Sequence, residues 1–246
     1  MAMCPIQPNS DLIWMQRALA LAKTTRGHVW PNPPVGCVLI KKGAILAEAA
    51  THPGGRPHAE RAALERASAK SGISIKGATL YVTLEPCCHW GKSPPCTDAI
   101  IASGVRRVVS AIQDPDPRVN GGGFERLRNA GIEVSVGLCA AQANQVMSGF
   151  FHRIRTGRPE LLVLEHKTET IPDGADALLS TINGALSLRC RMLQGVKTTS
   201  ISEGSASDLL AGLADIGLTT VAVFARDPVI NVLRPIANTR ADRGAA

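Results

Sequence analysis

The sequence is poor in aromatic residues, which make up 3% of its 246 residues and include a single tyrosine. Proteins that bind single-stranded nucleic acid stack bases on aromatic side chains, so this scarcity argues against that class despite a net charge of +7. No apolar run approaches the length of a membrane span, so we expect no membrane partner. The first residues have neither a basic start nor an apolar core, which predicts no targeting peptide and a cytoplasmic location.

Cysteine is present, but as an odd and scattered set of seven. Small proteins held together by disulfides have an even framework instead, so reduced thiols that hold a metal are the better interpretation. Hydrophobic residues make up 45% of the chain and charged residues 19%. These values are ordinary for a globular protein with a buried core.

A His-x-Glu pair and two later cysteines lie in the stretch from His58 to Cys96. Catalytic zinc takes three protein ligands and leaves one position for water, and His58, Cys87 and Cys96 can supply those three. Glu60 would then stand beside the metal and move protons, because zinc lowers the pKa of a bound water to about 7. Cys88 could compete for the metal, but Cys87 directly follows Glu-Pro, as in the pattern His-x-Glu then Pro-Cys of zinc nucleobase deaminases.

Eight residues separate the two predicted cysteine ligands, more than the general deaminase pattern has. The segment EPCCHWGKSPPC, with HAE upstream and PNPPVG before it, resembles the diaminohydroxyphosphoribosylaminopyrimidine deaminases of riboflavin biosynthesis, in which this long insertion is the rule. The resemblance runs from about Trp14 to Pro159. It implies a three-layer α/β/α cytidine-deaminase-like fold with a five-stranded mixed sheet. It also implies Zn2+ as cofactor, a phosphorylated pyrimidine as substrate and hydrolytic deamination as the reaction.

Four residues become predicted substrate contacts through this resemblance. Asn32, in a proline-bounded loop, would face the pyrimidine ring, because an amide can read donors and acceptors together. His52 would contact substrate or phosphate, and His89 and Lys92 lie in the loop between the predicted cysteine ligands. The alternatives are a turn asparagine bonded to its own backbone and an ordinary surface histidine.

The segment QDPDPRVNGGG adds two acidic residues to the predicted substrate site. The resembling family has Asp-Pro-Asn-Pro there, whereas this chain has Asp114 and Asp116. A carboxylate at position 116 repels phosphate, so we expect either weaker binding or a contact through another face. NGGG also lacks the basic residue expected inside that loop.

Hydrophobic spacing predicts five helices and five strands in the first 160 residues. The helices are expected over 11–25, 58–70, 94–104, 124–131 and 140–159, and the strands over 35–40, 45–50, 78–84, 107–112 and 132–137. The first two strands are mostly apolar, which favours burial on both faces.

The tail has a different character, and we expect a deaminase domain over 1–158 followed by a short C-terminal α/β remnant over 159–246. In bifunctional members of the resembling family, an NADPH-dependent reductase domain follows the deaminase. Here Ala225-Arg226 replaces its glycine pair, no Gly-x-Gly-x-x-Gly occurs, and the 86 residues from Leu161 are expected to be too few for a six-stranded nucleotide-binding sheet. One helix and strand are expected over 208–228. We predict no cofactor-binding residues in the tail, a separate reductase, and a homo-oligomer.

Two other functions stay open at this point. A base deaminase acting on tRNA or DNA would use the same zinc core, although the scarcity of aromatic residues argues against it. An inactive zinc-bearing structural or regulatory protein is the other alternative, kept open by Asp116 and opposed by the complete set of His58, Glu60, Cys87 and Cys96.

Overall fold

The structure, a computed structural model, describes residues 8–201, 205–237 and 239–241. The chain divides into two compact units. The first comprises Met1–Thr25, Pro34–His52 and Arg56–Val146, and the second comprises Arg26–Pro33, Pro53–Gly55 and Met147–Ala246. In the described ranges, none of the helices is long and apolar enough to cross a membrane.

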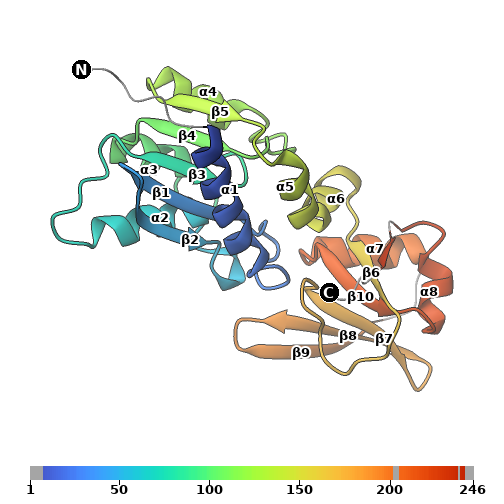
Figure 1. Ribbon diagram of the computed structural model, residues 1–246. Coiled ribbons are helices and arrows are strands. Elements are labelled where there is room, and N and C mark those ends of the chain that lie inside the picture. The colour runs from blue at the N-terminus through green and yellow to red at the C-terminus, as the bar shows by residue number, and fades with distance from the viewer. Residues whose placement is uncertain (1–7, 202–204, 238, 242–246) are drawn as a thin grey trace. The chain divides into compact units, whose positions relative to one another are not determined.

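A five-stranded mixed sheet forms the centre of the first unit (Figure 1). Its order is β2-β1-β3-β4-β5, with β1 antiparallel to β2 and β3, and β3, β4 and β5 parallel to one another. The strands are β1 (Gly36–Lys41), β2 (Ala44–Ala50), β3 (Thr79–Val82), β4 (Arg107–Ser110) and β5 (Glu133–Val136). All five predicted strands are present, and the predicted mixed sheet is confirmed.

Helices cover both faces of this sheet, so the predicted three layers are confirmed. In Figure 1, α1 and α5 pack on one face, and α2, α3 and α4 pack on the other. The helices of this unit are α1 (Pro8–Lys23), α2 (Ala59–Ser68), α3 (Cys96–Ser103), α4 (Gly122–Asn129) and α5 (Ala140–Val146). The carboxyl ends of β3 and β4 meet at one edge, where loops between strand and helix carry chemistry in sheets of this kind.

Two predicted features of the first 160 residues are wrong. β2 is not buried on both faces: it lies at the sheet edge, and its first residues are exposed, whereas β1 between two strands is buried along nearly its whole length. The predicted helix over 140–159 is two helices, α5 and α6 (Ser148–Thr156). The break is at Met147, whose φ of −105° and ψ of 16° leave the helical region, and the two helices belong to different units.

A six-stranded sheet forms the second unit, so the expectation that the tail is too short for one is wrong. The order is β11-β6-β10-β7-β8-β9; the first four strands are parallel, and β7, β8 and β9 form an antiparallel meander. Tight hairpins need far fewer residues than helical crossovers, which is how the tail accommodates six strands. The strands are β6 (Glu160–Leu164), β7 (Ala177–Ile182), β8 (Ala185–Met192), β9 (Gly195–Ile201), β10 (Thr220–Phe224) and β11 (Thr239–Ala241).

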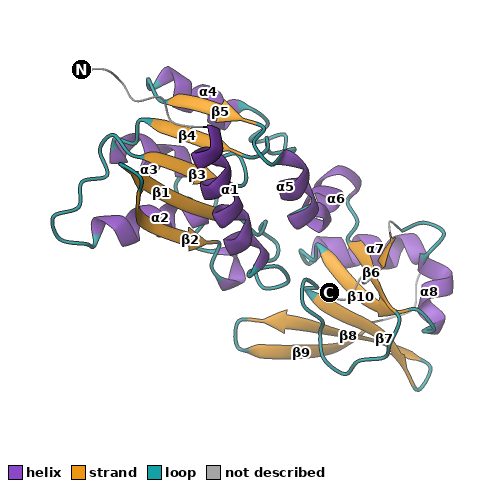
Figure 2. Cartoon of the chain, viewed as in Figure 1, coloured by secondary structure: helices purple, strands orange, loops and turns teal. Residues whose placement is uncertain are grey.

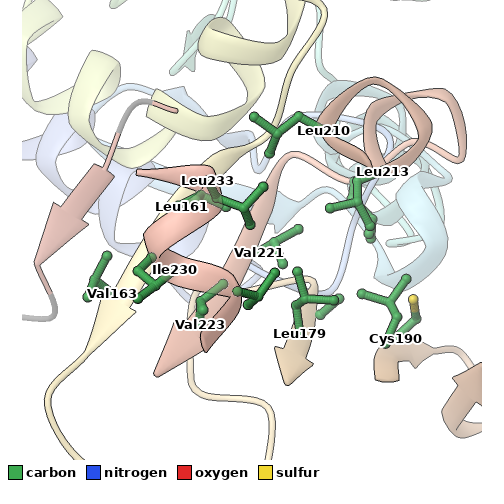
Figure 3. Packing of buried hydrophobic residues seen from close by; sticks show 14 residues of the cluster. Leu161, Val163, Leu179, Cys190, Leu210, Leu213, Val221, Val223, Ile230 and Leu233 are labelled. Carbon is green, nitrogen blue, oxygen red and sulfur yellow. The ribbon is translucent and has the colours of Figure 1, made fainter. Parts of the chain in front are cut away.

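Short helices pack against this second sheet, which is seen most easily in Figure 2. They are α6, α7 (Ala206–Asp215) and α8 (Pro228–Leu233). A 3-10 turn at Pro53–Gly55 also belongs to this unit. The predicted helix and strand over 208–228 correspond to α7 and β10 and are confirmed. Figure 3 shows the apolar residues that join the sheet to α7 and α8, among them Leu161, Leu179, Val221, Leu210, Leu213 and Leu233.

Candidate active site

Three segments bring the predicted metal ligands together in the first unit. His58 has an extended backbone and occupies the N-cap position of α2, while Cys87 lies in the loop after β3 and Cys96 is the first residue of α3. Pro95 precedes α3, and proline before or at the first helical position favours a helix start. The positive end of the α3 dipole therefore favours the thiolate form of Cys96, and the positive end of the α2 dipole favours the ionised form of Glu60 in the first turn of that helix.

The geometry of these side chains fits a tetrahedral zinc ion. His58 Nδ1 lies 3.7 Å from Cys87 Sγ and 3.5 Å from Cys96 Sγ, and the three ligand atoms lie within 4.8 Å of one another. Zinc bonds of roughly 2.3 Å to sulfur and roughly 2.0 Å to nitrogen put neighbouring sulfur and nitrogen ligands about 3.6 Å apart at a tetrahedral centre. The donor set, one imidazole and two thiols, is also one that zinc prefers.

Electrostatics around the two thiols favours at least one thiolate. Hydrogen bonds from the Cys96 thiol, from His58 and from the Cys96 backbone N–H, at 3.3 Å from Cys87 Sγ, lower the pKa of Cys87 to about 4. The same interaction with Cys87, together with burial, raises the pKa of Cys96 well above its usual value. Cys88, the alternative cysteine, points elsewhere: its Sγ lies 3.7 Å from the carbonyl oxygen of Arg118.

Glu60 lies in the first turn of α2, and its side chain is buried beside the three predicted ligands. Burial raises the pKa of Glu60 to about 7, although the nearby His58 opposes this shift. A carboxyl group whose pKa is close to neutrality can both accept and deliver a proton, as a general acid–base catalyst must. The structure therefore places a proton carrier beside a potential metal centre.

The loop between the two cysteine ligands is held at several points. Arg56 donates a hydrogen bond of 2.5 Å from Nη1 to Ser93 Oγ, and Arg61 donates one of 3.4 Å to the Pro94 carbonyl oxygen. His89 is half-buried, and its Nδ1 has no hydrogen-bond partner among the described residues. Lys92 is exposed on the same loop. Both predicted substrate contacts are thus presented by a tethered loop that begins and ends at the metal ligands.

Asp114 and Asp116 are both buried in the segment after β4. Asp114 Oδ1 accepts the backbone N–H of Asp116 at 2.9 Å, and burial raises the pKa of Asp114 to about 6. Asp116 forms an ion pair with Arg118, at 2.5 Å from Nη2 to Oδ2, which lowers the pKa of Asp116. Asp116 lies within electrostatic range of His89, so the segment after β4 lies near the loop between the cysteine ligands.

Two residues near the site were missed by sequence reasoning. Arg118 lies two residues after the second acidic residue and compensates its charge, and the sequence DPDPR contains both residues. Glu85 is buried and accepts hydrogen bonds from four backbone N–H groups of the segment after β4. Its position directly before Pro-Cys was visible in the sequence, but its partners, 29 to 39 residues away, were not.

The remaining two predicted contacts have their own partners. His52 Nε2 lies 3.3 Å from Nη2 of Arg66. Arg66 is in the last turn of α2, at the opposite end of the helix from the proposed zinc ligand His58. Asn32 donates a hydrogen bond of 2.6 Å from Nδ2 to the Gly55 carbonyl oxygen, and both residues group with the second unit. Substrate contact by Asn32 and His52 stays a prediction.

Comparison with known families agrees with this geometry. The family described as the cytidine and deoxycytidylate deaminase zinc-binding region matches residues 8–112. This range contains His58, Glu60, Cys87 and Cys96.

Comparison with single proteins covers a longer part of the chain. The chain is 47% identical over 175 residues to the riboflavin biosynthesis protein RibD of Aquifex aeolicus and 49% identical over 170 residues to that of Escherichia coli. It spans about half the length of these two relatives, 46% and 44%. A diaminohydroxyphosphoribosylamino-pyrimidine deaminase of Buchnera aphidicola is 44% identical over 149 residues, which cover 99% of that protein and 61% of this chain.

Solved structures resemble nearly the whole chain. A crystal structure of a diaminohydroxyphosphoribosylaminopyrimidine deaminase/5-amino-6-(5-phosphoribosylamino)uracil reductase from Thermotoga maritima matches with a TM-score of 0.76 and 28% identity. The match covers 95% of this chain and 86% of that one. The likeness therefore includes the second unit as well as the first.

Proposed function

This chain belongs to the diaminohydroxyphosphoribosylamino-pyrimidine deaminase family, and on that premise we propose that it deaminates a diamino-ribosylamino-pyrimidinone 5'-phosphate in riboflavin biosynthesis. The reaction replaces the 2-amino group by a carbonyl oxygen from water and releases ammonia. The observation that carries the proposal is the grouping of His58, Cys87 and Cys96 within 4.8 Å, with Glu60 buried beside them.

We assign the three grouped side chains as the zinc ligands. A zinc ion held there supplies a Lewis acid that makes water a nucleophile near neutral pH. His58 would bind through Nδ1, the nitrogen that faces both sulfur atoms. Cys87 and Cys96 would bind as thiolates, and the low pKa of Cys87 lowers the cost of deprotonating the first of them.

Glu60 is the proposed proton carrier. Its carboxylate accepts a proton from the attacking water and delivers it to the departing amine, so that the ring carbon gains oxygen and the nitrogen leaves as ammonia. Burial of Glu60 excludes bulk water, which would otherwise compete for these proton transfers. A glutamine at this position keeps the size of the side chain and cannot carry the proton.

Substrate recognition is proposed for the residues around this centre. His89 and Lys92 lie on the tethered loop between the cysteine ligands, and Lys92 offers an exposed ammonium as a point charge for phosphate. Asp114 and Asp116 line the segment after β4, while Asn32 and His52 are proposed from the resemblance to the family.

The second unit is proposed to be a reductase-like fold that does not use NADPH. In parallel sheets, nucleotides bind outside the carboxyl ends of the strands, and here Asp227 lies just beyond the central strand β10. The Asp227 carboxylate accepts hydrogen bonds from the N–H and hydroxyl of Thr181 and from the N–H of Val229. A buried carboxylate so placed repels a diphosphate, which supports a separate reductase in the cell.

We also propose an assembly state and a cellular location for the protein. We propose a homo-oligomer, and we propose the cytoplasm as the location, because the two ligand thiols need a reducing compartment to stay available for zinc.

Ammonia release tests the proposal directly. Purified protein carrying one zinc per chain would be incubated with the freshly prepared diamino substrate beside a Glu60→Gln variant carrying the same zinc. We expect release by the native chain and a loss of at least about a hundredfold in the variant, the usual contribution of a general acid–base group. Equal rates in the two proteins would contradict the role of Glu60. Consumption of NADPH with the deaminated product would contradict the proposal for the second unit.

A further inference from the structure

The glycine-rich segment after β4 is not a phosphate-binding loop in this chain. A run such as NGGG before a helix suggests backbone N–H groups that cradle an anion. Each N–H from Gly121 to Phe124 already has an acceptor within the protein, however. Glu85 Oε2 accepts from Gly121 at 3.0 Å, Glu85 Oε1 accepts from Gly123 at 2.9 Å and from Phe124 at 3.2 Å, and the Val119 carbonyl oxygen accepts from Gly122 at 2.7 Å. The Glu85 carboxylate thus occupies the place of the anion.

Arg118 is the cation that this segment presents to solvent. Its Nε and Nη2 donate to the Asp116 carboxylate, at 3.0 Å and 2.5 Å, while 68% of its side chain is exposed. Nη1 makes no hydrogen bond to any residue that the structure describes. Because guanidinium has five N–H donors in a planar fork, a pair that uses one edge leaves the other edge free for a second anion.

Two other arginines of the first unit are already engaged, whereas Lys92 stays exposed on the loop between the cysteine ligands and is the other cation proposed for phosphate. Arg126 donates to Asp98 Oδ1 at 2.6 Å and to the Cys88 carbonyl oxygen at 3.3 Å. Arg56 is bonded to Ser93. The backbone of Arg118 lies beside the loop that carries Cys87, because the Arg118 carbonyl oxygen is 3.7 Å from the Sγ of Cys88, the neighbour of that proposed zinc ligand.

We propose that Arg118 binds the 5'-phosphate of the substrate through its free guanidinium edge and that Asp116 orients it. This inference rests on the proposed deaminase function and specifies how a chain with a carboxylate at position 116 still accepts a phosphorylated substrate. Asp116 and Arg118 act as a neutral pair, so Asp116 positions the guanidinium without leaving a net negative charge to repel phosphate. Arg118 is a binding residue, and Asp116 is a positioning residue.

Four variants and two substrates test the pair. KM and kcat would be measured for the phosphorylated substrate and its dephosphorylated riboside with Arg118→Gln, Asp116→Asn and the double variant. Arg106→Gln serves as the control, because it removes the same charge from an exposed residue. Arg106 immediately precedes β4, whereas Arg118 lies beyond the other end of that strand. Inhibition by inorganic phosphate gives a second readout that does not depend on the ring.

We expect Arg118→Gln to raise KM for the phosphorylated substrate, and Ki for phosphate, by about tenfold or more while changing kcat and the KM for the riboside little. Asp116→Asn should raise the KM for the phosphorylated substrate by less than Arg118→Gln does, because an amide holds the guanidinium less firmly than a carboxylate but leaves Arg118 in place. The KM of the double variant should not exceed that of Arg118→Gln, because no unpaired carboxylate remains. An Arg118→Gln KM within about twofold of the Arg106→Gln control would overturn the inference, as would an equal rise for both substrates. If the native protein releases no ammonia, the proposed function fails. Calorimetric binding of inorganic phosphate then tests Arg118 separately: weaker binding by Arg118→Gln than by Arg106→Gln would support its role, and equal binding would overturn it.

Discussion

Glu85 is expected to be the residue that holds the substrate-facing segment in place, and Glu85→Gln tests this. The carboxylate comes from the loop after β3 and accepts four backbone N–H groups, two from the segment between β4 and α4 and two from the first turn of α4. Two donate to each oxygen: Gly123 and Phe124 to Oε1, and Asp114 and Gly121 to Oε2. Glutamine has nearly the same shape but replaces one of these acceptor oxygens by an NH2 group.

The magnitude follows from counting the donors that lose an acceptor. Whichever oxygen is replaced, two N–H groups that are buried or partly buried then face another donor, and each unsatisfied group costs about 1–3 kcal/mol. The expected loss of unfolding free energy is therefore about 2–6 kcal/mol. Glu133→Gln makes the matched control, because its side chain is 60% exposed and accepts one hydrogen bond, from Arg107, so that its loss should cost at most about 1 kcal/mol.

Urea unfolding of the zinc-loaded proteins measures both differences. We expect Glu85→Gln to unfold at a clearly lower urea concentration with an unchanged slope, and Glu133→Gln to unfold close to the native protein. Since the loosened segment carries Asp114, Asp116 and Arg118, KM should also rise in the Glu85 variant. If Glu85→Gln costs no more than Glu133→Gln, the four hydrogen bonds do not carry the stability assigned to them.

Three further outcomes follow from the structure. Cys96→Ser should lower the zinc content from one ion per chain to well below one, measured by metal analysis after dialysis, and full zinc retention would contradict the ligand assignment. Burial alone would raise the pKa of Asp11, but hydrogen bonds from Arg107 outweigh burial and lower the pKa below its usual value. The ionised Asp11 therefore stabilises the folded state fully above about pH 4, and this stabilisation is lost as the pH falls through the lower native pKa. The stability gap between the native protein and Asp11→Asn should therefore shrink on acidification from pH 5, and a gap that widens would refute this. Gly149→Ala should destabilise the second unit by about 1–3 kcal/mol in thermal unfolding, because the added Cβ would lie 2.1 Å from Thr220 Oγ1, and an unchanged melting temperature would contradict that packing.

The metal site was the part of the molecule most open to prediction from the sequence. Zinc accepts few residue types, and the His-x-Glu and Pro-Cys pattern of zinc deaminases pointed to His58, Cys87 and Cys96, which the structure brings together. The central strands were equally accessible, because β3 and β4 have apolar residues at their buried central positions.

The features that escaped prediction depend on partners far away in the chain. Nothing local marks β2 as an edge strand, because strand order is a property of the whole sheet. Apolar spacing runs across Met147 although the helix breaks there. The pairing of Arg118 with Asp116 required the conformation of a loop, which in turn depends on hydrogen bonds to Glu85 from 29 to 39 residues away.

The measurement that tests the central claim most directly is ammonia release from three separate amines by the same zinc-loaded preparation. The amines are the diamino pyrimidinone phosphate, a cytidine nucleotide and adenosine within a tRNA. We predict release from the diamino pyrimidinone phosphate alone. Release from the cytidine nucleotide or the tRNA, with none from the diamino pyrimidinone phosphate, would contradict the assigned substrate while leaving the zinc site in place.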